Sequence, residues 1–150
     1  MNSEDGPVDD RLRWMAASEV RVIAGIWATV DTDRILAGLG LPAELLAGDP
    51  HLGARVTVVR PGDGAPLVIV EPATEGRLAE TLARRGEGRI GEYVESPLPL
   101  DRLAALAASA GVRLSRPLDG PFGRSVLVQP GTPGDPLVVV VERPAGTIGR

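Results

Sequence analysis

This chain of 150 residues carries a net charge of −4, and its 43% apolar, 24% charged and 3% aromatic residues are typical of one folded domain. It contains no cysteine, no lysine and a single histidine, His51, so all 16 basic residues are arginines. These absences exclude disulfides, thiol and Schiff-base chemistry, lysine-dependent phosphate loops and multi-histidine metal sites, and the acidic balance argues against nucleic-acid binding.

The ends of the chain give no membrane or export signal. The longest apolar run, Leu137 to Val141, is far too short to span a bilayer, and the first ten residues are acidic, unlike a signal peptide. We therefore expect a cytoplasmic protein that binds neither membranes nor nucleic acid. Residues 1–19 are expected to form a flexible tail with a short helix around Trp14 and Met15.

The first half of the chain, residues 20–73, predicts a strand, a helix and three further strands. Residues 20–30 are β-branched and aromatic, and Asp31 to Asp33 form a helix N-cap cluster that opens a helix over 34–39. Residues 41–54 are irregular, and any strand before Arg55 is poorly marked. Strands over 55–60 and 67–70 then form a hairpin around a Pro-Gly-Asp-Gly turn.

The second half, residues 89–144, repeats this order after a linking segment at 74–88. The link predicts a helix over 74–85 with Leu78 and Leu82 on its apolar face. Arg-Val-Thr-Val-Val-Arg-Pro-Gly followed by Pro-Leu-Val-Ile-Val-Glu returns about 70 residues later as Arg-Ser-Val-Leu-Val-Gln-Pro-Gly followed by Pro-Leu-Val-Val-Val-Val-Glu. The repeat predicts a helix over 101–110, strands near 112–116, 124–130 and 136–142, and a C-terminal tail at 145–150.

Tandem βαβββ modules of this length resemble the vicinal oxygen chelate superfamily, which includes glyoxalase I, bleomycin-resistance proteins, extradiol dioxygenases and methylmalonyl-CoA epimerase. The stretch 70–88, with Glu-Pro ending a strand and Arg-Gly-Glu-Gly after a helix, is similar to the epimerase-like branch. Gly-Pro-Phe-Gly-Arg-Ser at 120–125 is similar to the loop over the cavity mouth in the bleomycin-resistance and glyoxalase branches. The resemblance implies an α+β fold in which two modules form a cup-shaped, partly open β-barrel with the helices outside.

Enzymes of this superfamily hold a divalent metal in the cup with His, Gln or Glu from four inner strands. The resemblance places the four positions near Ala24, Val68, Ile90 or Gly91, and Val138 or Val139. Alkyl groups cannot coordinate a divalent ion, so we expect a metal-free protein without a cofactor. Epimerase and glyoxalase chemistry are put in doubt, because both need the metal to polarise a carbonyl.

Six residues are candidates for ligand binding: Trp27, Tyr93, Phe122, Arg60, Val68 and Val70. Trp27 either lines the cup or packs as an ordinary core aromatic, depending on the strand register. Tyr93 is expected on the cup face as a platform for a ligand, with a solvent-facing position as the alternative. Phe122 is either a lid over a ligand or a plug that packs its loop down, and an arginine at the rim, such as Arg60, would bind a carboxylate or phosphate.

Glu95, Tyr93 and Glu92 are the candidates for acid–base catalysis. Either carboxylate would serve as a general base if an apolar cup raised its pKa, and the alternative is ordinary solvation at the surface. His51 lies in an irregular loop, where a lone histidine commonly has no catalytic or binding role.

Three functions remain open. The first is a metal-independent protein of the glyoxalase and bleomycin-resistance type, which sequesters a hydrophobic or aromatic natural product in the cup and so confers self-resistance. The second is a cofactor-free isomerase, cyclase or lyase in natural-product biosynthesis, and the third is a structural or regulatory module without a ligand. The family also implies a homodimer, in which a partner covers exposed strand edges.

Overall fold

The computed structural model describes residues 13–15, 20–62, 64–132 and 134–143. Its elements in chain order are a 3₁₀-helix η2 (Arg13–Met15), β1 (Arg21–Ala28), α2 (Thr32–Leu39), β2 (Ala43–Asp49), β3 (Ala54–Val59), β4 (Leu67–Pro72), α3 (Arg77–Arg85), β5 (Gly88–Ser96), α4 (Leu100–Ala110), β6 (Leu118–Gly120), β7 (Gly123–Val128) and β8 (Leu137–Glu142). The short helix expected around Trp14 is therefore present. The rest of the tail predicted at 1–19, apart from residues 13–15, and the tail predicted at 145–150 lie outside the described residues.

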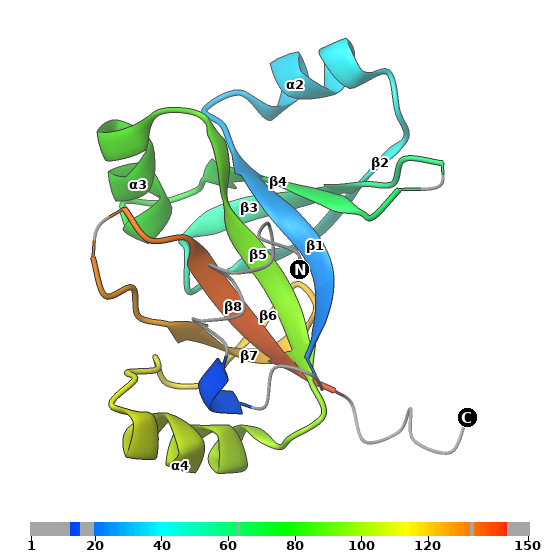
Figure 1. The fold of residues 1–150 in the computed structure, drawn as a ribbon. Helices are drawn as coiled ribbons and strands as arrows, with labels where there is room; N and C mark the ends of the chain where they lie inside the picture. Colours follow the sequence, from blue (N-terminus) through cyan, green and yellow to red (C-terminus); the bar gives the residue numbers. More distant parts are fainter. Residues whose placement is uncertain (1–12, 16–19, 63, 133, 144–150) are drawn as a thin grey trace, which may run out of the picture.

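All eight strands belong to one sheet with the order β2-β3-β4-β1-β5-β8-β7-β6 (Figure 1). In each half the first strand pairs in parallel with the last, as β1 with β4 and β5 with β8, while β1 and β5 join the halves as antiparallel neighbours. The two end strands, β2 and β6, come into contact, so the sheet curls into a nearly closed barrel. The predicted α+β fold of two βαβββ modules is confirmed.

Local sequence signals explain where the helices begin and end. The Asp31 carboxylate accepts a hydrogen bond from the Arg34 backbone N–H at the start of α2, and Gly40 ends that helix with φ of +64°. Figure 1 shows α2 and α4 at opposite ends of the molecule and α3 beside the hairpin that joins β7 to β8. Among the described helices, none is long and apolar enough to cross a bilayer.

Two details of the strand prediction are wrong. The segment 112–116 forms only an isolated bridge between Leu114 and Val128, and the second strand of the second module is β6 instead. Backbone hydrogen bonds from Ser115 and Gln129 hold this segment beside the end of β7, and Pro117 then interrupts further pairing. Conversely, the irregular stretch before β3 contains β2, whose side chains are mostly exposed and so give no apolar alternation.

Two hydrophobic clusters lie on the two faces of the sheet. One, here called the cup cluster, joins the inner faces of both modules and contains Ala24, Ile26, Ala28, Leu52, Ala54, Val56, Val58, Val68, Val70, Leu78, Ile90, Tyr93, Leu127, Leu137, Val139 and Val141. The other packs the second module against α4 and η2. Side chains of β8 alternate between them, because Leu137 and Val139 face the cup whereas Val138 and Val140 face α4.

Candidate functional site

At least one of the residues that the resemblance assigned to each metal-ligand position lies in the cup, and none offers a side-chain donor atom. Ala24, Val68 and Val139 are fully buried members of the cup cluster. At Gly91 a side chain has no room, because an added Cβ would collide with the Leu137 carbonyl. Among the described residues there is no group of three His, Cys, Asp or Glu that could hold a metal. This alkyl lining does not fit a divalent ion.

Tyr93 faces the cup as predicted, and its hydroxyl is already engaged. It is fully buried and donates a hydrogen bond to Asp49 Oδ2 at 2.5 Å. Burial, followed by the charge of Asp49 and this hydrogen bond, raises the pKa of Tyr93 well above its usual value. Asp49 ends β2 in the poorly marked stretch, so no sequence pattern predicts this pair.

Phe122 takes the plug arrangement rather than that of an open lid. It sits in the tight turn between β6 and β7, half buried against the cup cluster. Its ring meets the Tyr93 ring edge to face, with 5.0 Å between centroids and 64° between planes. Val68 and Val70 are fully buried in the same cluster, whereas Arg60 is exposed just after β3. The structure therefore brings Tyr93, Phe122, Val68 and Val70 together and leaves Arg60 apart.

His51 joins the two modules, a role that its sequence context did not indicate. Its Nε2 lies 3.0 Å from the Ser125 carbonyl oxygen and 3.2 Å from Ser125 Oγ, and its Nδ1 lies 3.2 Å from Ser115 Oγ. The His51 backbone N–H donates to Asp49 Oδ1 at 2.8 Å. The contacts of the His51 ring join residues 64 and 74 positions apart in the chain, and no local sequence pattern predicts them.

The three acid–base candidates do not converge. Glu95 binds Arg21 at 2.8 Å and Arg143 at 3.4 Å. Burial by itself would raise the pKa of Glu95, but the two guanidinium groups outweigh it and the pKa is lowered, the reverse of what the predicted general base required. Glu92 lies opposite Val138 in the β5–β8 strand pair, and Val138 belongs to the cluster that packs against α4. Glu92 also binds Arg89 at 3.0 Å, so it lies outside the cup in which Tyr93 is buried.

Trp27 lies on the outer face of the sheet, because its neighbours Ile26 and Ala28 take the cup face. There it lines a pocket of about 300 Å³, here called the Trp27 pocket, whose other walls are Arg34, Ile35, Gly38, Leu39 and Leu67. The indole Nε1–H is buried without a hydrogen-bond partner among the described residues. Of the two orientations left open by the sequence, the outward one is correct, and it places Trp27 in a pocket formed with α2.

The glutamates of the epimerase-like stretch hold α2 over this pocket. Glu87 accepts hydrogen bonds from the Thr29 hydroxyl at 2.7 Å and the Val30 backbone N–H at 3.0 Å, and it binds Arg34 at 2.6 Å. These contacts, led by the Val30 N–H, lower the pKa of Glu87 to about 2. Glu71 accepts from the Thr32 backbone N–H at 3.0 Å. The stretch thus has a structural use here, fixing the first turn of α2.

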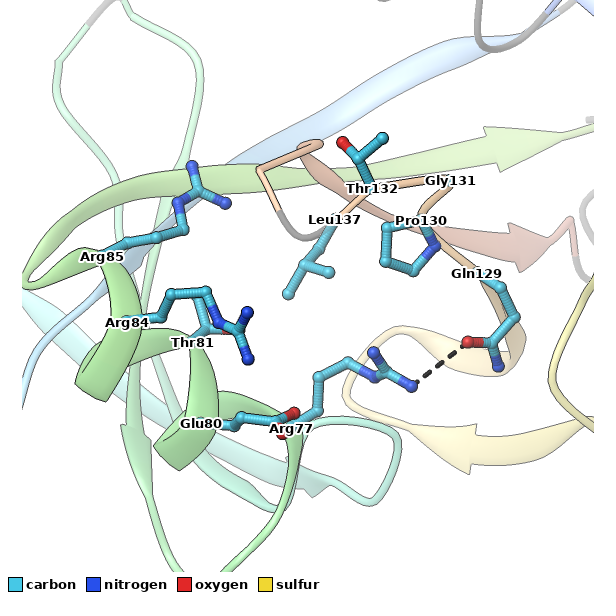
Figure 2. A pocket seen from close by; sticks show the side chains of 10 residues that line it. All are labelled: Arg77, Glu80, Thr81, Arg84, Arg85, Gln129, Pro130, Gly131, Thr132 and Leu137. Carbon is cyan, nitrogen blue, oxygen red and sulfur yellow. Dashed lines mark hydrogen bonds between the residues drawn. The ribbon is translucent and has the colours of Figure 1, made fainter.

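A second pocket, here called the arginine pocket, lies between α3 and the β7–β8 hairpin (Figure 2). Its volume is about 270 Å³, and α3 contributes Arg77, Glu80, Thr81, Arg84 and Arg85 to its walls. Residues 129–132 of the hairpin form the facing wall, and Leu137 lies at its base. No local pattern in the sequence distinguishes these arginines, because the pocket forms only where the hairpin packs beside α3.

No protein-family model and no curated protein matches the chain. Among solved structures, methylmalonyl-CoA epimerase from Mycobacterium tuberculosis is 22% identical with a TM-score of 0.69, over 87% of this chain and 92% of that one. A Streptomyces coelicolor methylmalonyl-CoA epimerase in complex with 2-nitronate-propionyl-CoA is 22% identical, with a TM-score of 0.68 over 83% and 95% of the two chains. A hypothetical protein from Bacillus halodurans C-125 is 17% identical, with a TM-score of 0.68 over 83% and 95%. At these identities the likeness concerns architecture alone: the chain has the vicinal oxygen chelate fold.

Proposed function

We propose that this protein is a metal-independent small-molecule-binding protein that holds a hydrophobic or aromatic ligand in the Trp27 pocket. The observation that carries the proposal is the make-up of that pocket, where Trp27, Ile35 and Leu39 surround a space of about 300 Å³. Small-molecule sites are concave and mostly apolar, with a few polar groups that orient the ligand. The volume lies at the lower end of the usual range, which favours a compact ring system.

The charge of the pocket walls indicates what else the ligand carries. The indole Nε1–H of Trp27 is buried, so it offers the ligand no exposed donor. The one charged wall, Arg34, is already neutralised by both oxygens of Glu87, at 2.6 and 2.8 Å. We therefore expect a neutral aromatic compound.

The proposed ligand site is on the outer face of the sheet, whereas the sequence predicted a site in the cup. The cup is occupied by the protein's own side chains, since Ile26, Tyr93 and Leu127 are almost entirely buried there in one contiguous cluster. A ligand would have to displace Phe122 before it could enter. Space in a packed interior is costly to create, whereas the Trp27 pocket is already open.

Binding without conversion is favoured over the isomerase, cyclase or lyase alternative. The residues that line the Trp27 pocket include no carboxylate, and Tyr93 and Glu95 are engaged elsewhere. The epimerases that share the fold act on methylmalonyl-CoA, but the metal positions here carry alkyl groups and we derive no metal-assisted step. Retention of an unchanged ligand would amount to sequestration, the basis of self-resistance to a toxic natural product.

The two tryptophans allow a direct test. Trp14→Phe leaves Trp27 as the only tryptophan, so its emission reports on the pocket. Titration with small aromatic ketones and quinones should quench or shift this emission in a saturable way, and the compound should be recovered unchanged. The matched variant Trp27→Phe retains Trp14, which lies near the second cluster, and should lose the spectral response and most of the affinity.

Other outcomes would contradict the proposal in distinguishable ways. A compound that raises the Tm without changing Trp27 emission would place the ligand elsewhere, and loss of its binding in Phe122→Ala would identify the cup. Conversion of the compound would establish an enzyme. If a broad panel of aromatic carbonyl compounds produces neither a spectral change nor a Tm shift, the Trp27 pocket is not a site for this class of ligand.

A further inference from the structure

The helix α3 presents two chemically different faces. Leu78 and Leu82 pack against the cup cluster, and the adjacent side of the helix, with Arg77 and Arg84, faces the β7–β8 hairpin. Arg77 and Arg84 are seven residues apart, which places them on the same side of the helix with their Cα atoms about 10 Å apart along its axis. Figure 2 shows both guanidinium groups pointing into the arginine pocket, although they start from different turns.

Among the described residues, none of the three arginines of this pocket forms an ion pair with a carboxylate. Arg77 donates to the neutral amide oxygen of Gln129 at 3.2 Å, and Arg85 donates to the backbone carbonyl of Asp135 at 3.4 Å. Within the described part of the chain Arg84 has no hydrogen-bond or ion-pair partner at all.

Several arginines elsewhere are paired with carboxylates. Arg21, Arg34 and Arg89 each bind a glutamate, at 2.8, 2.6 and 3.0 Å. Three arginines, Arg77, Arg84 and Arg85, line the pocket with the carboxylate of Glu80, and the Asp135 carboxylate lies next to it, bound to Thr132. The excess of arginines gives a local positive field in a chain with a net charge of −4. Such a field attracts an anion into the pocket.

The remaining walls indicate the size and shape of the anion. Leu137 at the base belongs to the cup cluster, and Pro130 offers a second apolar surface. A volume of about 270 Å³ admits a small compound but no polymer. The planar guanidinium groups present forked pairs of donors that match the oxygens of a phosphate or carboxylate.

We propose that the arginine pocket binds a small phosphate monoester. The doubly charged phosphate lies between Arg77 and Arg84, and the apolar substituent packs against Leu137 and Pro130. Two guanidinium groups in the walls of one pocket favour a dianion over a single carboxylate. The pocket shares no lining residue with the Trp27 pocket, so this inference stands or fails independently of the proposed function.

Calorimetric titration of the full chain with phenyl phosphate, inorganic phosphate and phenol tests each part of the site. Phenyl phosphate should bind most tightly, inorganic phosphate more weakly, and phenol without measurable heat. Arg84→Gln and Arg77→Gln should each weaken phenyl phosphate binding about tenfold or more, since a hydrogen bond to a charged group contributes about 1.5–3 kcal/mol. Arg102→Gln removes one charge from the exposed face of α4 and is the matched control, with an expected change below twofold.

Arg84 is exposed, so its substitution should leave the fold intact, and the far-ultraviolet circular dichroism checks this. Absence of phenyl phosphate binding at millimolar concentration would overturn the proposal. Equal weakening by Arg84→Gln and Arg102→Gln would also overturn it, because that result indicates attraction by overall charge alone. In the Trp14→Phe protein, phenyl phosphate should leave Trp27 emission unchanged, which separates this site from the Trp27 pocket.

Discussion

Glu87 binds Arg34 through both carboxylate oxygens, at 2.6 and 2.8 Å, and so connects the segment before β5 to the first turn of α2. The two residues are 53 positions apart, and the same carboxylate also accepts from Thr29 and Val30. Because Arg34 and α2 form one side of the Trp27 pocket, this contact connects a motif in the linking segment with the shape of the proposed site.

The Glu87 contacts predict a loss of stability in acid. The pKa of Glu87 falls from 4.5 to about 2 on folding, so its contribution is complete above pH 4.5 and is lost as the pH falls towards 2. The free energy of unfolding of the native protein should therefore decline across this window, and that of Glu87→Gln should decline less. Denaturant titrations at a series of pH values measure the difference.

The exposed Glu75, on the segment before α3, provides the control for this experiment. Glu75→Gln removes an equal charge and should keep the native pH dependence. If Glu87→Gln and the native protein lose stability in parallel between pH 4.5 and 2, the folded-state contacts of Glu87 do not stabilise the protein as described.

The Tyr93–Asp49 hydrogen bond predicts a large effect from the loss of one oxygen atom. Tyr93→Phe keeps the ring against Phe122 but leaves a buried Asp49 oxygen without its donor. We expect a loss of about 2–3 kcal/mol in the free energy of unfolding, because an unsatisfied charged group in the interior is costly. Urea denaturation gives the value, and a loss below about 0.5 kcal/mol would mean that the bond contributes little.

A double-mutant cycle separates this bond from other effects of the substitutions. Asp49→Asn alone should also destabilise the protein, since the amide is a weaker acceptor for Tyr93. The double variant should lose less than the sum of the two single losses, because one interaction cannot be removed twice. Strict additivity would show that Tyr93 and Asp49 are energetically independent despite their 2.5 Å contact.

The alkyl lining of the cup predicts that divalent metals do not stabilise this protein. Incubation with Zn²⁺, Ni²⁺ or Co²⁺ should leave the Tm unchanged, and elemental analysis after desalting should find well under one metal per chain. A stoichiometric metal would mean that donors outside Ala24, Val68 and Val139 assemble a site.

The repeat made the fold predictable, because each module's apolar strands and capped helices carry local signals. The Asp31 cap of α2 and the apolar strand Leu137 to Val141 are both visible in the sequence and both present in the structure. The site was less predictable. Trp27 could be placed on either face, since a shift of one residue in strand register reverses every side chain, and β1 and β5 contain two such irregularities.

The remaining features that could not be predicted depend on contacts between residues far apart in the sequence. Asp49 and His51 lie in a stretch without periodicity, yet they meet Tyr93, Ser115 and Ser125 of the other module. The strand β2 was not predicted because its side chains are mostly exposed and show no apolar alternation, although its backbone pairs with β3. Such features depend on closure of the barrel, which no window of local sequence describes.

The homodimer implied by the family remains a prediction, and we expect β2 to form its interface. Leu45 on this end strand is 71% exposed, an unusual position for a large apolar side chain. Sedimentation at several concentrations should reveal the dimer, and Leu45→Lys should shift it towards monomer, with Glu44→Lys as the neighbouring control. The contact between β2 and β6 already shields part of this edge, and a monomer at all concentrations would refute the prediction.

Phe122 offers the clearest test of the plug arrangement. Phe122→Ala removes a half-buried ring from beside Tyr93, and we expect a loss of about 2 kcal/mol, below the 3–5 kcal/mol typical of a fully buried phenylalanine. The space created should admit benzene or indole, seen as a Tm increase in the variant but not in the native protein. Leu127→Ala, which truncates a strand residue of the same cluster, controls for cavity formation in general. If the native protein binds an aromatic ligand and Phe122→Ala abolishes that binding, Phe122 acts as a lid and the cup is the site.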